Sequence, residues 1–484
     1  EAKSWPASLC PPCRTDDGNT GGQNAMSHIA PNFRKASRDA VRNSQVIAAV
    51  RKTANLLSEK MALAVADTPD FEALRDYGRT RKLEISGNLE KYAQSFTANA
   101  QAAGAVVHRA KDAAEAARLA IKIAADNGTK TAVKGKSMTA EEVELNEALE
   151  AAGITVTETD MGEFIIQLAN EKPSHIMAPA IHRSRAQVAE LFTDKLGTPP
   201  DLGVEALVAA ARKDLREKFL AADMGITGGN FAIAKTGSIV LVSNEGNIRM
   251  ATTLPRIHLA VVGIDKIIPE MADMPKFLAL LARSACGQTI SSYMSIVTGP
   301  RRTGEEEGPE QLHIILLDNG RSRIAKGPYR EILHCLHCGA CLSHCPVYRA
   351  VGGHAYQATY PGPMGSVISP LISGLEIYAD LPNACTLCGR CAEVCPVCVP
   401  LPDYLRDLRS DVKKPPFMMK LTAFGANTPS LYRLGMIVMR RMLKKGGKGL
   451  MAPALKEWMV CREPPKPQEG ESFRDWWGTR SHGK

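Results

Sequence analysis

A cysteine motif that occurs twice constrains this chain more than any other feature of its sequence. The first copy reads CLHCGACLSHCP from Cys335, and the second reads CTLCGRCAEVCP from Cys385, so both have the spacing C-x2-C-x2-C-x3-C-P. Three thiolates at this spacing can each bind one corner of a cubane iron–sulfur cluster, whereas the fourth, before the proline, points away and binds the other cluster. The two motifs therefore complete each other.

This exchange of the fourth cysteine predicts two [4Fe–4S] clusters with crossed ligands. Cluster 1 takes Cys335, Cys338, Cys341 and Cys395. Cluster 2 takes Cys385, Cys388, Cys391 and Cys345. Zinc is the alternative, because CxxC pairs also form zinc ribbons. Three close cysteines followed by a fourth before proline fit a cubane better.

Three histidines lie beside these cysteines in the sequence. Histidine replaces two cysteine ligands in Rieske centres, but eight cysteines already suffice for two cubanes. We therefore expect His334, His337 and His344 to lie near the clusters or at the surface without binding iron. Cys398 is a ninth thiol of this region and is expected to be a small core residue.

The chain as a whole has the features of a cytoplasmic protein with two or three domains. Its 484 residues exceed one ordinary core. No apolar run reaches the roughly 20 residues of a membrane helix, and no signal-peptide pattern opens the chain. Thirteen cysteines in such a chain favour metal binding over disulfides. Residues 1–25 are rich in Gly, Pro and polar types, and we expect a disordered or mis-started leader there, before Met26.

The pattern over residues 101–322 alternates between strand and helix, which predicts an α/β fold with a mostly parallel sheet covered by helices. A helical segment, residues 26–100, precedes this domain. Residues 174–180, SHIMAPA, are interpreted as one of its strands. Residues 231–243 are expected to form a β-hairpin, with Gly237 at a positive φ.

Local signals add three finer predictions. Residues 34–64 contain no Pro or Gly and are expected to form one helix. The helix that begins near Ser137 has no strict capping box at that residue, and the pair Thr139 and Glu142 fits one better. Residues 257–269, IHLAVVGIDKIIP, are expected to supply a buried strand.

Two places in the α/β domain carry candidate chemistry. Glu245 lies on a Gly-bounded loop after a strand and is the candidate catalytic group, although a glutamate that is solvated or caps a turn is the preferred interpretation. Lys134 and Lys136, with Ser137 at a helix start, can hold an anion such as a carboxylate; a solvated positive turn is preferred. The stretch GITGGN lacks the G-x-G-x-x-G order, so NAD binding is not expected.

Residues 403–484 are expected to form a basic, partly helical tail. From Leu401 onward, 17 Lys and Arg residues stand against 8 Asp and Glu residues. Basic residues flank the apolar stretch Leu434–Met439, as in a helix that docks on an acidic partner subunit or lies on an anionic membrane surface. Binding to nucleic acid, the third interpretation of this charge, is not expected.

Several stretches outside the cysteine motifs resemble one known family. They are GITGGNFAIAKTGSIVLVSNEGN, RSACGQTISSYMSIVTGPRR, GGHAYQATYPGPMGSVISPL and the C-terminal SFRDWW. Together they resemble the LutB family (also called YkgF or LldF), the iron–sulfur subunit of the bacterial lactate utilisation system. The resemblance implies a LUD domain, whose fold is similar to the sugar-phosphate isomerase and CoA-transferase-like group. A mainly helical two-cluster module over residues 323–402 would follow it.

The same resemblance implies a function and partners. The protein is expected to act with LutA-like and LutC-like companions that oxidise L-lactate to pyruvate. Electrons would leave through the clusters toward a quinone-linked acceptor. The protein is expected in the cytoplasm, and the basic tail leaves a peripheral position on the inner face of the membrane open as an alternative. Two alternatives stay open: a self-contained oxidoreductase that binds its own hydroxy acid in the α/β domain, and a non-redox iron–sulfur protein with a structural or regulatory role.

Overall fold

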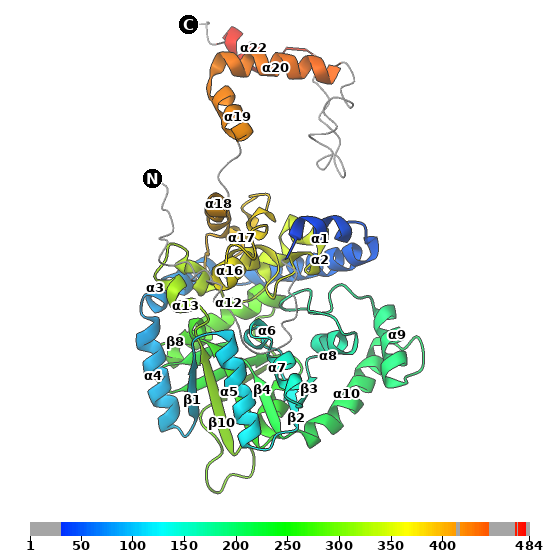
Figure 1. Cartoon of the computed structure of the whole chain (residues 1–484), viewed down its shortest axis with the longest axis vertical. Coiled ribbons are helices and arrows are strands. Elements are labelled where there is room, and N and C mark those ends of the chain that lie inside the picture. The colour runs from blue at the N-terminus through cyan, green and yellow to red at the C-terminus, as the bar shows by residue number, and fades with distance from the viewer. Residues whose placement is uncertain (1–30, 413–416, 445–469, 472, 481–484) are drawn as a thin grey trace, which may run out of the picture. The chain divides into compact units, whose positions relative to one another are not determined.

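The computed structural model describes residues 31–412, 417–444, 470–471 and 473–480 (Figure 1). The chain divides into two compact units, Glu1–Val412 and Lys413–Lys484, and each is described on its own. The expected leader, residues 1–25, lies outside the described residues.

The described part of the first unit opens with helices. They are α1 (Phe33–Ala40), α2 (Ser44–Ala66), α3 (Phe71–Gly87) and α4 (Leu89–Ala102). The single helix expected over 34–64 is wrong, because the chain breaks between α1 and α2. Asn43 ends this break: its side chain accepts a hydrogen bond from the Val46 N–H at 3.1 Å and so caps α2.

Six parallel strands form the central sheet of the α/β part (Figure 1). In spatial order they are β1 (Val106–Ala110), β10 (Gln311–Leu317), β7 (Ile257–Gly263), β4 (Met224–Thr227), β2 (Thr131–Lys134) and β3 (Thr155–Glu158). Every residue of β7 is buried, as expected for a strand covered on both faces. Helix α5 (Ala113–Asp126) packs against β1 and β10, and α10 (Val204–Ala221) packs against β2. The predicted α/β fold with a parallel sheet is confirmed.

A second sheet of four strands, which the sequence did not predict, adjoins the first. In spatial order its strands are β8 (Ile267–Ile268), β5 (Phe231–Ile233), β6 (Ser238–Ser243) and β9 (Tyr293–Val297). The hairpin expected over 231–243 is confirmed, since β5 and β6 are antiparallel and Gly237 has φ 66°. A Cβ on Gly237 would stand 2.2 Å from the Ala100 nitrogen of α4, so only glycine fits this close approach. The run 257–269 is not one strand but two, one in each sheet.

Two further local predictions are wrong. Residues 174–180 form turns and bends, not a strand, because the His175 ring accepts hydrogen bonds from the N–H groups of Met177 and Ala178 at 3.0 and 3.1 Å. The N-cap of the next helix is Ser137, whose hydroxyl accepts from the Ala140 N–H at 3.1 Å. These side-chain bonds compete with the strand and cap patterns that the sequence suggested.

The remaining helices of the α/β part are α6 (Met138–Glu142), α7 (Leu145–Ala151), α8 (Met161–Leu168), α9 (Arg185–Leu196), α11 (Asn247–Thr253), α12 (Met274–Cys286) and α13 (Arg321–Ala325). The cysteine-rich part that follows is built from short helices. They are α14 (Ala340–Ser343), α15 (Pro346–Val351), α16 (Gly362–Ser373), α17 (Arg390–Glu393) and α18 (Leu401–Val412).

One hydrophobic core joins the α/β part to the cysteine-rich part. It contains Val262 of the central sheet, Phe96 of α4, Tyr348 of α15 and Val397 after the second motif. The N-terminal helices complete this core, since α2 packs against α14 and α15. The two parts therefore share one core, which matters for any site at their border.

The second unit contributes helices α19 (Phe417–Asn427), α20 (Pro429–Lys444) and α22 (Phe473–Arg480) to the described residues. Apolar side chains of α20, among them Leu434 and Ile437, are about half exposed or more. Among the described residues, no helix is both long enough and apolar enough to cross a bilayer.

Candidate metal centre

The two cysteine motifs fold as two copies of one loop. In each loop the residue before the second cysteine has a left-handed backbone: φ is 57° at His337 and 56° at Leu387. In each, a glycine with positive φ follows, Gly339 (79°) or Gly389 (83°), and a short helix begins directly after it. Because the same dihedral angles recur at the same places, both loops present their cysteines in the same way.

One group of thiols lines a small apolar cavity. It consists of Cys335, Cys338, Cys341 and Cys395. The other lining residues are apolar, among them Ile176, Met364 and Val399. Four thiols around a hydrophobic space are the donor set that a cubane cluster uses, and an apolar shell with little solvent is its usual surrounding. The residues present therefore fit the cofactor that the motif predicts.

The second group of thiols is recognised by its mutual electrostatic influence. Burial raises the pKa of the Cys345 thiol to about 11, and the nearby Cys385 and Cys388 thiols add to the effect. Burial likewise raises the pKa of Cys391 to about 12, with Cys385, Cys345 and Cys388 as its neighbours. Cys345 of the first motif thus lies among the cysteines of the second. The structure brings the thiols together in the two sets that the spacing predicts, and which atoms bind iron stays a prediction.

Backbone N–H groups donate to sulfur in both loops. His337 N–H donates to Cys335 Sγ at 3.3 Å, and Leu387 N–H donates to Cys385 Sγ at 3.2 Å. The fourth cysteine of each motif also accepts one such bond, at 3.5 Å for Cys345 (from Tyr348) and 3.3 Å for Cys395 (from Val399). These bonds stabilise the negative charge that a thiolate ligand carries. Within the described residues, no group of three or more His, Cys, Asp or Glu side chains is spaced to hold one single metal ion.

The two thiol groups differ in their distance from solvent. Each group has two buried cysteines, Cys338 and Cys395 in the first and Cys345 and Cys391 in the second. In the second group Cys388 is exposed, and the neighbouring Leu387 is 41% exposed. The second loop therefore presents its edge to solvent, while the first loop faces the α/β part.

Buried charges surround the first loop, and sequence reasoning missed them. Lys266 Nζ donates to the Cys335 carbonyl at 3.3 Å and lies 3.3 Å from the Asp265 carboxylate. Lys82 Nζ donates to the Asp265 carbonyl at 2.7 Å, and Arg321 pairs with the Asp265 carboxylate. Burial opposes ionisation of Asp265, but Lys266 and Arg321 hold its pKa well below the usual range. The one available sequence signal was an Asp–Lys pair inside the apolar run 257–269.

Glu245, the candidate catalytic group, lies on the loop between β6 and α11. Its Oε2 accepts a hydrogen bond at 3.0 Å from the N–H of Met161, the first residue of α8. The residue as a whole is exposed, but the protein atoms around its carboxyl group, together with the nearby Asp160 carboxylate, raise the Glu245 pKa to about 7. Glu245 therefore caps the start of helix α8. This is close to the preferred interpretation, in which the glutamate caps a turn. Glu245 also lines a cavity of about 270 Å³, and its catalytic role stays a prediction.

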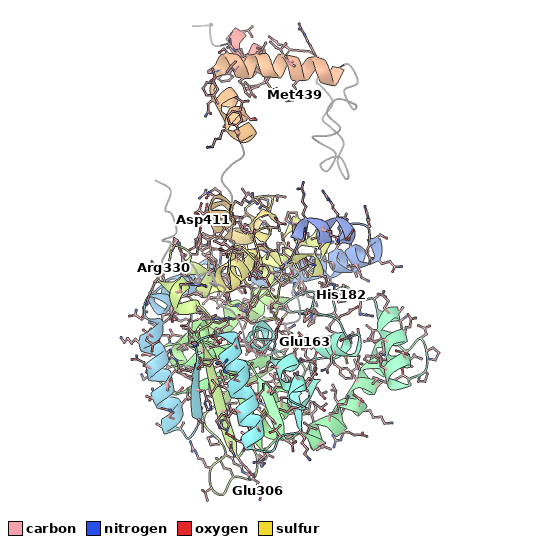
Figure 2. The ribbon with its side chains drawn as sticks, in the orientation of Figure 1. Glu163, His182, Glu306, Arg330, Asp411 and Met439 are labelled. Carbon is pink, nitrogen blue, oxygen red and sulfur yellow. The ribbon has the colours of Figure 1, made fainter. Side chains whose placement is uncertain are left out.

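The solvated positive turn expected at Lys134 and Lys136 is wrong. Lys134 is fully buried and its Nζ donates to Glu158 at 2.6 Å and to Glu141 at 2.9 Å. Lys136 lies on the wall of the 270 Å³ cavity, with its Nζ 3.5 Å from the carboxylate of Glu163, which is labelled in Figure 2. Lys134 is therefore an interior charge with two carboxylate partners, whereas Lys136 has a carboxylate at 3.5 Å but no hydrogen bond among the described residues.

The histidines near the motifs bond to protein groups. His334 is buried, with its Nε2 3.1 Å from the Ser86 hydroxyl, and His344 Nδ1 lies 2.9 Å from the Ala340 carbonyl oxygen. His337 packs edge-on against the Tyr360 ring, with 5.3 Å between ring centroids. All three histidines thus contact other protein groups near the cysteine motifs.

Three family descriptions match successive parts of the chain. Residues 93–317 match the LUD domain, residues 331–399 match the 4Fe-4S dicluster domain, and residues 412–482 match the C-terminal region of lactate utilisation protein B. The second match supports bound iron–sulfur clusters. The chain is therefore an iron–sulfur protein with a LUD domain.

Curated relatives match over almost the full length. Lactate utilization protein B of Macrococcus caseolyticus is 39% identical over 468 residues, which cover 93% of this chain and 97% of the relative. The protein of the same name from Oceanobacillus iheyensis is 42% identical over 427 residues, covering 86% and 88%. The "uncharacterized electron transport protein YkgF" of Escherichia coli K12 is 38% identical over 455 residues, covering 92% and 96%. With its LUD domain, its 4Fe-4S domain and these relatives, the chain belongs to the lactate utilisation protein B family and is an iron–sulfur protein of lactate utilisation.

Proposed function

We propose that this chain is the electron-transfer subunit of a complex that oxidises L-lactate to pyruvate, and that it holds two [4Fe–4S] clusters. The observation that carries the proposal is the pair of like-folded cysteine loops, each of which places its fourth cysteine among the other's three. Such clusters carry single electrons. Oxidation of L-lactate to pyruvate releases two electrons and two protons. Two one-electron clusters in one chain can together accept both electrons.

The ligands in this proposal are the two sets that the spacing predicts. The two motifs lie about 40 residues apart and cross over, so neither loop can hold a complete set alone. The four N–H···S bonds and the apolar cavity favour thiolate ligation at both sites. The names of the relatives, lactate utilization protein B and electron transport protein, support the substrate and the electron-carrying role.

The unequal burial of the loops suggests where electrons cross the protein surface. The exposed Cys388 and the half-exposed Leu387 make the second loop the natural point of exchange with another protein. The partners are LutA-like and LutC-like companion subunits, and the final acceptor is quinone-linked. The exposed apolar side chains of α20 in the second unit, beside Arg433 and Arg441, suit contact with an acidic partner or an anionic membrane surface. We propose that the protein lies in the cytoplasm, peripheral on the inner membrane face.

The test is anaerobic purification of the chain from Met26 onward, alone and with its two companions, followed by electron paramagnetic resonance after addition of L-lactate. Signals of reduced clusters only when the companions are present support an electron carrier fed by another subunit. Signals from the lone chain favour a self-contained oxidoreductase. If neither lactate nor dithionite reduces the clusters, the result favours a non-redox protein in which the clusters have a structural role.

A further inference from the structure

We propose that the 270 Å³ cavity beside the first cysteine loop is a binding site for a small carboxylate anion, with Lys136 as its charge partner. Its walls include residues 136–139, residues 228–230, and the pair Leu336 and His337 of the first loop. An engineered cavity of about 150 Å³ holds a benzene molecule, so this space accepts an acid of comparable size or somewhat larger.

The ammonium group of Lys136 is the main reason to expect an anion. Its Nζ is buried and makes no hydrogen bond among the described residues. The nearest carboxylate oxygen, Glu163 Oε1, is 3.5 Å away and is also without a hydrogen bond. Charge-assisted bonds between ammonium and carboxylate are about 2.7–2.9 Å long. A buried charge without a hydrogen bond is costly. The Lys136 side chain lines the cavity, so its rotation into the cavity would give the ammonium a ligand carboxylate as partner.

The acidic side chains at the cavity are already engaged. Asp160 accepts hydrogen bonds from the N–H groups of Gly162 and Glu163 at the start of α8. Glu245 accepts from Met161 N–H at the same helix end, where the helix dipole stabilises negative charge. Burial raises the pKa of Glu163 to about 7, which weakens its competition for Lys136 at neutral pH. A second lysine, Lys266, also lines the cavity, with its ammonium paired to Asp265.

Small residues form the cavity wall next to Lys136. The backbone of Gly228 approaches Ser137 so closely that a Cβ on Gly228 would stand 2.6 Å from the Ser137 hydroxyl oxygen. Ser137 and Gly228 both line the cavity. A hydroxyl and an ammonium on one wall suit a carboxylate with an oxygen on the adjacent carbon, that is, a 2-hydroxy or 2-oxo acid. This choice of acid rests on the proposed function, whereas the anion site itself does not.

Calorimetric titration of the intact, cluster-loaded chain tests the site. The probes are L-lactate, pyruvate, acetate and inorganic phosphate at constant ionic strength and without companions. We expect saturable binding of lactate and pyruvate, loss of affinity by about tenfold or more in Lys136→Met, and near-normal affinity in Lys136→Arg. Lys213→Met, the same change on the exposed face of α10, is the matched control and keeps full affinity.

A second measurement uses the wild-type protein, so it does not depend on whether a variant folds. It follows the protection of a cysteine by the ligand. Cys286 lines the cavity and is partly exposed, whereas Cys398 does not line it. Bound lactate is expected to slow the alkylation of Cys286, measured by mass spectrometry, and to leave the alkylation of Cys398 unchanged.

The proposal is overturned if no carboxylate binds saturably, if Lys136→Met binds like the wild type, or if Cys286 is not protected. Binding of acetate and phosphate as tight as that of lactate keeps an anion site but rejects the 2-hydroxy acid class. The reduction of the clusters by lactate is measured in a separate experiment. The anion site and the proposed electron-transfer function can therefore be rejected independently of each other.

Discussion

Arg75 of α3 donates two hydrogen bonds to the main-chain carbonyl of Cys395, at 3.1 Å from Nε and 3.0 Å from Nη2. The same guanidinium donates to the Glu393 carbonyl at 3.0 Å. An N-terminal helix thus holds the fourth cysteine of the second motif, 320 residues further along the chain. Cys395 is the predicted crossed ligand of the first loop, so its position depends on a helix outside both motifs.

Replacement of Arg75 by methionine is therefore expected to loosen the site at the first loop. A hydrogen bond from a charged group contributes about 1.5–3 kcal/mol to the stability of a folded structure. We therefore expect the variant to lose iron to a chelator faster than the wild type, and the decay of visible absorbance measures this rate. Arg79→Met, one turn further along α3 on a more exposed side chain, is the control. Equal rates for the two variants would show that Arg75 does not support the site.

The crossed ligand sets make a second prediction. Cys345→Ser is expected to damage the cluster of the second loop and to leave that of the first loop intact, because Cys345 lies among Cys385, Cys388 and Cys391. Iron content and the paramagnetic resonance spectrum of the reduced protein measure this. Cys398→Ser is the control and should retain all iron. Selective loss of the cluster at the first loop would contradict the crossed assignment.

Local patterns in the sequence predicted the parallel sheet and the pairing of cysteine motifs. The buried strands are apolar runs such as that of β7, and the motif spacing is a local property of each loop. The second sheet escaped prediction because β8 has two residues and β9 is exposed at Tyr293, Met294 and Ile296, without the alternation of a half-buried strand. Such strands exist only because a neighbour pairs with them.

The rest of the candidate site depends on contacts between distant residues. Lys82 meets the Asp265 carbonyl across 183 positions, and Glu245 caps a helix that begins 84 positions earlier. No window of sequence contains both partners, so neither contact leaves a local pattern. The prediction that Lys134 lies on a solvated turn failed for the same reason, since Glu158 on β3 supplies its counter-charge.

The charge of Lys266 yields a third prediction, on reduction potential. The Lys266 side chain is 8% exposed, and its ammonium donates to the Cys335 carbonyl. A positive charge within several ångströms favours the reduced, more negative state of a cluster. Lys266→Met is therefore expected to lower the potential of the cluster at the first loop by on the order of 50–100 mV. Redox titration followed by paramagnetic resonance measures the shift, and the cluster at the second loop is the internal control. An equal shift at both sites, or none, would contradict the prediction.

His258 provides the last prediction, which concerns stability in acid. The ring is completely buried in β7, its Nε2 lies 2.7 Å from the Thr227 hydroxyl, and burial lowers its pKa to about 4 from the ordinary 6.5. Between pH 6.5 and 4 the unfolded chain binds the proton that the folded chain excludes, so the free energy of unfolding falls as the pH falls. The loss at pH 5 is about 2 kcal/mol for this residue.

His258→Gln removes the titrating group and keeps a side chain able to bond to Thr227. The variant is expected to lose less stability than the wild type between pH 7.5 and pH 5, with the difference read from anaerobic urea unfolding midpoints. His354→Gln, at an exposed position, is the control and should follow the wild type. If His258→Gln and the wild type decline in parallel, the imidazole takes up its proton in the folded state as easily as in the unfolded state. Burial in β7 would then impose no acid sensitivity.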